Sequence, residues 1–171
     1  MPWIFAYGSL MWDFDCDHEE RTSGVLDGFH RSFNKKSTRN WGTADAPGPV
    51  LGLEPGGECV GVVFRVDADS SGRVVTKIDE REGPSYRARA ESVRLPDGRT
   101  VTAKVWINDR SASTYIGDKS RTERARMANT ASGENGSAAE YVFETRRKLR
   151  ELDIEDPSVE NFARRVSELS N

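Results

Sequence analysis

The chain has 171 residues, of which 36% are hydrophobic and 31% charged, and its net charge is −3. This length suits one domain better than two, so we expect a single domain over residues 1–171. The acidic balance argues against nucleic acid as a partner, no apolar run is long enough to span a membrane, and the opening residues suit a strand better than a signal peptide. Because the two cysteines, Cys16 and Cys59, form at most one disulfide, we expect a cytoplasmic protein.

The N-terminal part of the chain predicts strands and one long loop. Residues 3–7 form a short aromatic strand that stops at Gly8, and residues 24–33 alternate in part between apolar and polar side chains. Residues 35–48 are rich in Ser, Thr, Asn, Gly and Pro and lack apolar periodicity, which predicts a loop. Loops of this length are often binding loops, so residues 39–48 are either an ordered segment or a lid.

Two turn signals, Pro55–Glu58 and Pro96–Gly98, predict β-hairpins in the middle of the chain. The strands that they would join are, in chain order, residues 50–53, 59–66, 86–95 and 99–107. The last of these strands alternates cleanly between apolar and polar residues, as a sheet with one buried face requires.

Helices are predicted between and after these strands. They cover residues 71–82, a segment from about 120 to 133, residues 138–152, and a segment from 157 to the end. Ser120 with Glu123 matches a capping box, and Asp156 before Pro157 offers an N-cap and a first-turn proline. These patterns together predict an α+β domain, in which a small mixed or antiparallel β-barrel carries helices on its outside.

The histidines and cysteines do not predict a metal site or a catalytic relay. Residues 16–20 crowd Cys, Asp, His and Glu together, but consecutive side chains cannot all point at one ion, and no second cluster supplies further ligands. His30 has no carboxylate or serine at a spacing that suggests a triad. We therefore expect no metal site.

The turn after the first strand is the first candidate site. A strand that ends on Gly8-Ser9 exposes successive backbone N–H groups, which can hold a carboxylate, and Gly8 lets a ligand approach closely. The alternative is a tight turn that closes a hairpin.

Glu82 is the second candidate. It lies four residues after Ile78 and eight after Val74, so it continues the apolar stripe of the predicted helix and lies at its C-terminus. Burial and the helix dipole both raise the pKa of a carboxyl group there, which suits a general acid/base. The alternative is that the helix frays early and Glu82 points to solvent or pairs with Arg87.

Several short motifs follow one another in an order that is typical of one family. They are residues 5–12 (FAYGSLMW), 28–33 (GFHRSF), Ser37 with Gly42-Thr43, Pro47-Gly48 with 51–53, 59–66 (CVGVVFRV), 79–82 (DERE) with Tyr86-Arg87, 115–117, and Gly133 with Glu140-Tyr141. With these motifs the chain resembles the ChaC-type γ-glutamylcyclotransferases over nearly its full length.

The resemblance implies a small β-barrel enzyme without metal or cofactor that cleaves the γ-glutamyl amide of glutathione to 5-oxoproline and cysteinylglycine. The substrate's own α-amine attacks its side-chain carbonyl, so no protein nucleophile is needed, and Glu82 matches the family's catalytic acid/base. Four residues, Tyr7, Gly8, Ser9 and Leu10, match the family's glutamyl-binding turn. Tyr141 is a further substrate-binding candidate that would donate a hydrogen bond. The implied partner is a small molecule, and the sequence does not indicate an oligomeric state.

Two departures from the family pattern concern the substrate. Between Arg39 and Thr43 the loop contains Asn40-Trp41-Gly42, where relatives tend to have a single glycine. Before Tyr86 the chain reads Gly83-Pro84-Ser85, where a glycine pair is more usual. Both changes concern the leaving-group side, so another γ-glutamyl peptide or γ-glutamylamine is an alternative substrate. The sequence also leaves open an amidohydrolase with Cys16, Cys59 or Ser9 as nucleophile, and a non-catalytic protein that binds a γ-glutamyl metabolite.

Overall fold

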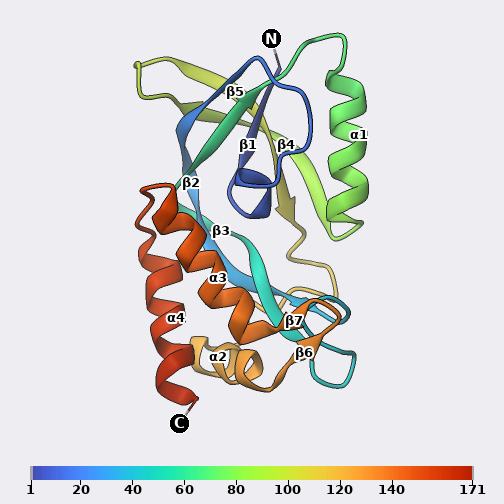
Figure 1. Ribbon diagram of the computed structural model, residues 1–171, viewed down its shortest axis with the longest axis vertical. Coiled ribbons are helices and arrows are strands. Elements are labelled where there is room, and N and C mark those ends of the chain that lie inside the picture. The colour runs from blue at the N-terminus through green and yellow to red at the C-terminus, as the bar shows by residue number, and fades with distance from the viewer. Residues whose placement is uncertain (1, 171) are drawn as a thin grey trace. The chain divides into compact units, whose positions relative to one another are not determined.

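The computed structural model describes residues 2–170 and contains a five-stranded barrel with four α-helices (Figure 1). In chain order the elements are β1 (Trp3–Ala6), η1 (Ser9–Met11), β2 (Glu20–Ser37), β3 (Gly48–Arg65), α1 (Ser71–Glu82), β4 (Tyr86–Arg94), β5 (Thr100–Asn108), α2 (Arg121–Thr130), β6 (Ser132–Gly133), β7 (Gly136–Ser137), α3 (Ala138–Glu151) and α4 (Pro157–Leu169). The predicted α+β class is confirmed. No helix among the described residues has both the length and the apolar character needed to cross a membrane.

The chain divides into two compact units, each built from two segments. The first contains the residues up to Phe29 together with Pro55–Asp109, and the second contains His30–Glu54 together with the residues from Arg110 onward. The long strands β2 and β3 each begin in one unit and end in the other.

The barrel strands follow the order β1-β3-β2-β4-β5 and close on themselves through β1 and β5. Strand β1 runs antiparallel to β3, with Trp3 opposite Arg65, and parallel to β5, with Trp3 opposite Ala103. Strand β2 pairs with β4 at Val25 and Leu26. The barrel therefore contains both parallel and antiparallel strand pairs. Its core in the first unit is made of buried side chains. Apolar side chains there with at most 1% of their surface exposed include Ile4, Phe5, Leu26, Val63, Phe64, Val93 and Val105.

The hairpin predicted around Pro96–Gly98 is confirmed. Strands β4 and β5 pair antiparallel from Tyr86 opposite Asn108 to Arg94 opposite Thr100. The turn is closed by hydrogen bonds from the Leu95 N–H to the Arg99 carbonyl and from the Gly98 N–H to the Leu95 carbonyl. Gly98 has φ = +91°, a left-handed conformation that favours glycine.

The hairpin predicted around Pro55–Glu58 is wrong. Residues 48–65 form one continuous strand, β3, and the Pro-Gly-Gly segment lies inside it. Gly56 and Gly57 have φ values of +105° and +71°, so the glycines bend the strand locally instead of reversing it. The predicted loop is also shorter than expected, because β2 continues to Ser37.

The loop after β2 is held by its own hydrogen bonds and by the β6–β7 hairpin. The Trp41 N–H donates to the Ser37 hydroxyl. The N–H groups of Glu134 and Asn135 donate to the carbonyls of Arg39 and Asn40. The loop is thus an ordered segment in this structure.

Helix α1 covers the residues that the sequence predicts and contacts β4. Its apolar side chains Val74 and Ile78 are buried, with 7% and 2% of their surface exposed. Gly83, with φ = +82°, ends the helix and donates its N–H to the Asp79 carbonyl.

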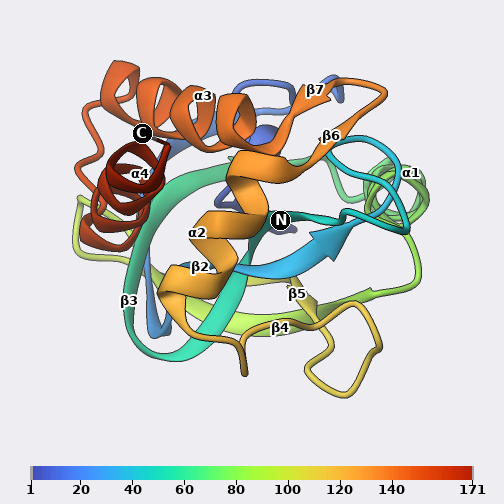
Figure 2. The same ribbon diagram turned by 90° about the horizontal axis from the view of Figure 1, so that it is seen from below.

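Helices α2, α3 and α4 belong to the second unit, and each contacts the other two (Figure 2). Each begins at a side-chain cap, because Ser120, Ser137 and Asp156 accept hydrogen bonds from the N–H groups three residues later. The predicted caps at Ser120 and Asp156 are therefore confirmed.

Candidate active site

The turn after β1 is a single turn of 3-10 helix and not the tight turn of a hairpin. Gly8 precedes it with φ = −128° and ψ = −138°, and the Met11 N–H donates to the Gly8 carbonyl at 2.9 Å. The N–H groups of Ser9 and Leu10 come before this first helical bond, and neither has a backbone acceptor among residues 2–170. Ser9 is exposed whereas Leu10 is buried, so the Ser9 side of this turn lies at the surface.

Tyr7 anchors this turn to the barrel. Its side chain is 8% exposed, and its hydroxyl donates a 2.6 Å hydrogen bond to the carbonyl of Trp106 in β5. The structure therefore gives Tyr7 a supporting role in the first unit, and its contact with a substrate stays a prediction.

Glu82 is the last residue of α1, and it is half-buried one turn after Ile78. The alternative in which the helix frays early is wrong, since the helix continues to this residue. Arg87, which the sequence offers as a partner for Glu82, lies 3.6 Å from the Asp109 carboxylate. The raised pKa of Glu82 stays a prediction.

Two side chains of the last turn of α1 fix this end of the helix within the first unit. Arg81 donates from Nη2 to the Ser9 hydroxyl at 2.6 Å and from Nη1 to the Asp13 carbonyl at 2.8 Å. Asp79 accepts a 2.6 Å hydrogen bond from the indole N–H of Trp106. Glu82 directly follows Arg81, so these contacts bring the end of the helix that carries a carboxylate to the turn that carries free N–H donors.

Arg81 is the residue of this site that the sequence did not indicate. Its partners lie 72 and 68 residues earlier in the chain, so no local spacing marks it. The only signal in the sequence is that Arg81 belongs to the family motif at residues 79–82 (DERE). Helical periodicity alone places Arg81 away from the apolar stripe and so gives it no role.

Tyr141 belongs to the second unit and is half-buried on α3. Its hydroxyl accepts a 3.0 Å hydrogen bond from the Leu51 N–H, and its ring lies 5.1 Å from that of Trp41 and 6.1 Å from that of Phe33. Tyr141 thus serves both packing and hydrogen bonding within this unit, and its contact with a substrate stays a prediction.

The segment that crowds Cys16, Asp17 and His18 packs against β3. The His18 ring lies edge-on to the rings of Phe14 and Phe64, with distances of 5.7 and 5.1 Å between ring centroids. No group of three or more metal-ligating side chains occurs among residues 2–170. Burial raises the pKa of the Cys16 thiol, which makes it a poor nucleophile near neutral pH.

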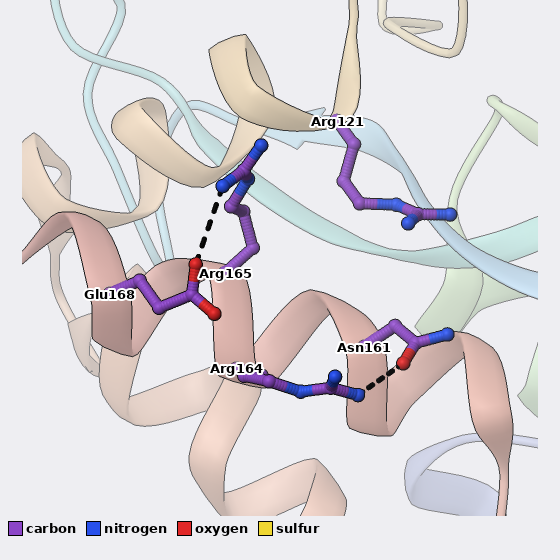
Figure 3. A pocket seen from close by; sticks show the side chains of 5 residues that line it. All are labelled: Arg121, Asn161, Arg164, Arg165 and Glu168. Atoms are coloured by element: carbon purple, nitrogen blue, oxygen red, sulfur yellow. Dashed lines mark hydrogen bonds and ion pairs between the residues drawn. The ribbon is translucent and has the colours of Figure 1, made fainter.

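A pocket of about 380 Å³ lies between α2 and α4 in the second unit (Figure 3). It is lined by Arg121, Asn161, Arg164, Arg165 and Glu168. Arg165 pairs with Glu168, and Arg164 donates to Asn161. None of the predicted site residues lines this pocket.

The sequence is similar to known proteins over nearly the whole chain. The family model described as ChaC-like protein matches residues 2–169. A glutathione-specific γ-glutamylcyclotransferase of Escherichia coli is 34% identical over 169 residues, which cover 98% of this chain and 73% of that protein. An Arabidopsis thaliana protein, γ-glutamylcyclotransferase 2-3, is 26% identical, over 96% of this chain and 87% of its own.

The fold also matches a solved structure. The crystal structure of a glutathione-specific γ-glutamyl cyclotransferase from yeast superposes with a TM-score of 0.88, over 98% of this chain and 96% of that one, at 20% identity. At 20% sequence identity, this structural similarity shows that the two proteins share a fold.

Proposed function

This chain belongs to the ChaC-like family and is an enzyme of the γ-glutamylcyclotransferase type, and we propose that its substrate is glutathione. The products would be 5-oxoproline and cysteinylglycine. The support comes from the relatives in Escherichia coli and fission yeast (Schizosaccharomyces pombe), which are both glutathione-specific γ-glutamylcyclotransferases. The non-catalytic alternative is set aside, because these relatives are enzymes. We also propose a cytoplasmic location, because Cys16 and Cys59 are free thiols.

The proposed reaction needs one proton carrier and no protein nucleophile. The α-amine nitrogen of the substrate forms a bond to its own side-chain carbonyl carbon, and the bond from that carbon to the cysteine nitrogen breaks. One proton leaves the amine and one proton reaches the departing nitrogen, so atoms and charge balance without another reactant. A carboxyl group that first accepts and then donates the proton performs both transfers.

We assign this carboxyl group to Glu82. The observation that carries the assignment is the placement of the last turn of α1, which ends in the half-buried Glu82 and is hydrogen-bonded to the turn at Ser9 through Arg81. In the proposed complex the N–H groups of Ser9 and Leu10 hold the α-carboxylate of the glutamyl group. Fixing that end folds the flexible glutamyl chain toward a five-membered ring, and such orientation supplies much of the rate gain in intramolecular reactions.

The test is an assay of purified protein with glutathione, in which 5-oxoproline is the measured product. Glu82→Gln is expected to reduce turnover to background and to leave the melting temperature unchanged, because the amide cannot carry a proton. Glu80→Gln is the matched control, since Glu80 is an exposed glutamate two residues earlier on the same helix. It should retain activity within about twofold of wild type.

Two results would contradict this mechanism. Release of free glutamate in place of 5-oxoproline would indicate hydrolysis. Near wild-type activity of Glu82→Gln would remove Glu82 from its role. Full activity of Cys16→Ala and Cys59→Ala is expected, and its loss would favour the amidohydrolase alternative.

A second substrate class is favoured by the segment after Glu82. Gly83 ends the helix in a left-handed conformation and Pro84 follows it, which fixes the backbone next to the proposed catalytic residue. If this stiff segment narrows the part of the proposed site that holds the leaving group, a smaller γ-glutamyl amine would be a better substrate than glutathione. A panel of γ-glutamyl amines and peptides, compared by kcat/KM, decides between the two classes.

A further inference from the structure

Arg81 connects the proposed catalytic helix to the proposed anion-binding turn. Its guanidinium reaches three acceptors on the segment that follows β1: the Ser9 hydroxyl at 2.6 Å, the Asp13 carbonyl at 2.8 Å and the Asp13 carboxylate at 3.3 Å. Its side chain is 30% exposed, so solvent only partly competes for these bonds. A planar guanidinium with several fixed donors suits such a bridge, and a lysine ammonium does not.

The bridge also determines what the Ser9 hydroxyl can do. A serine hydroxyl has one hydrogen to donate and accepts through its oxygen. Because the oxygen accepts from Arg81, the hydrogen points elsewhere, and a positively charged donor makes the hydroxyl a stronger donor in turn. Ser9 is exposed, so this hydrogen is available to a ligand at the turn.

We propose that Arg81 is a positioning residue for the reaction, a role that rests on the proposed function. By bridging Ser9 and Asp13 it sets the separation between Glu82, its neighbour in the chain, and the N–H groups that hold the substrate α-carboxylate. It also orients the Ser9 hydroxyl as a donor to that carboxylate. Arg81 touches no reacting atom and acts through Ser9 and through the position of Glu82.

The same helix offers a matched comparison one turn earlier. Lys77 also joins α1 to the segment after β1, since its ammonium lies 3.1 Å from the Asp15 carboxylate and 3.4 Å from the Asp15 carbonyl. This bridge is more exposed and lies farther from Glu82 along the helix. If these bridges only stabilised the helix, loss of either one would affect activity to a similar extent. If Arg81 positions the site, loss of the Arg81 bridge should lower activity much more than loss of the Lys77 bridge.

The experiment compares Arg81→Met with Lys77→Met in the 5-oxoproline assay, after thermal melting has shown that both variants are folded. We expect Arg81→Met to lower kcat/KM ten- to a hundredfold, with a rise in KM from the weakened carboxylate contact and a fall in kcat from the displaced Glu82. Lys77→Met should stay within about twofold of wild type. Arg81→Lys keeps the charge without the planar bridge and should fall between Arg81→Met and wild type.

Ser9→Ala shows whether Arg81 acts through the hydroxyl. In the Ser9→Ala background the loss caused by Arg81→Met should be smaller than in wild type, because one of its acceptors is already gone. Equal losses in both backgrounds overturn the proposal. So do full activity of Arg81→Lys and activity of Arg81→Met within twofold of Lys77→Met.

Failure of the proposed function gives a different pattern. In that case wild type releases no 5-oxoproline from glutathione, or Glu82→Gln keeps wild-type activity. If only the positioning role fails, Glu82→Gln is inactive while Arg81→Met stays active.

Discussion

Tyr115 shows how burial in the second unit changes a single side chain. Its hydroxyl donates a 2.7 Å hydrogen bond to Glu54, whose other carboxylate oxygen accepts from the Asn34 side chain. Burial, followed by the bond to Glu54, raises the pKa of Tyr115 to about 12 from its ordinary value of 10.0. The folded protein therefore favours the neutral phenol more than the unfolded chain does.

This pKa predicts that Tyr115 makes folding sensitive to alkaline pH. Between about pH 10 and pH 12 the unfolded chain loses the phenol proton while the folded protein keeps it, so this contribution to stability is present below pH 10 and is lost as the pH rises. Urea unfolding at pH 8 to 12 should show wild type losing about 1 kcal/mol more than Tyr115→Phe across this range, a value reduced for solvent screening. Parallel stability curves for the two proteins would contradict it.

At the scale of elements, the sequence predicts those segments whose signals are local. Helix α1 and the β4–β5 hairpin follow from apolar spacing and from the turn at Pro96–Gly98, and both occur where they were expected. The Pro-Gly-Gly segment has a composition suited to a turn, but it lies inside β3, a single strand that pairs with β1 and β2 in the barrel. That pairing is non-local, so the local composition does not report it.

The candidate site divides in the same way. The position of Glu82 at the end of a helix follows from spacing, because the stripe that includes Ile78 repeats every four residues. The bridge from Arg81 to Ser9 depends on how distant segments fold together, and no sequence period reports it. Local patterns thus predict the position of Glu82 but not the contacts that hold this end of the helix in place.

Gly61 allows β3 to lie close to β1, so a larger residue there is expected to destabilise the protein. A Cβ atom there would lie 2.3 Å from the Ala6 carbonyl and 2.7 Å from the Phe5 ring, so Gly61→Ala must push β1 away from β3. We expect a loss of about 2–4 kcal/mol in the free energy of unfolding, together with reduced activity, because the turn at Gly8 follows β1 directly.

Gly56→Ala is the control within the same strand. A Cβ atom at Gly56 would meet nothing within 4 Å, and its φ of +105° is the only cost, which is about 1 kcal/mol. Urea unfolding measures both variants, and equal losses would show that close approach to β1 is not what position 61 requires.

At the scale of the whole molecule, the two compact units share the strands β2 and β3. Neither unit consists of one continuous segment, so a cut that separates them must break both strands. We propose on this basis that residues 1–171 form a single domain that unfolds as one cooperative body.

A buried ion pair in the second unit provides the test. Arg31 is fully buried and lies 2.8 Å from Asp156, whose other carboxylate oxygen caps α4 by accepting from the Val159 N–H. Arg31→Met removes the cation and leaves a buried carboxylate, which is expected to cost about 3–5 kcal/mol. The exposed pair of Arg150 with Glu160 is the matched control, and Arg150→Met should cost less than about 1 kcal/mol.

The single-domain proposal is tested by following the unfolding of the first unit in a variant, Arg31→Met, that destabilises the second unit. In a Trp41→Phe background the remaining tryptophans, Trp3, Trp12 and Trp106, all lie in the first unit, so their fluorescence follows that unit alone. If the chain unfolds as one body, Arg31→Met shifts the fluorescence transition to lower urea by the same amount as the circular dichroism transition, which the helices of the second unit dominate. A fluorescence midpoint that stays at its wild-type position while the dichroism midpoint falls would mean that the units unfold separately, because destabilisation in one would then not reach the strands of the other.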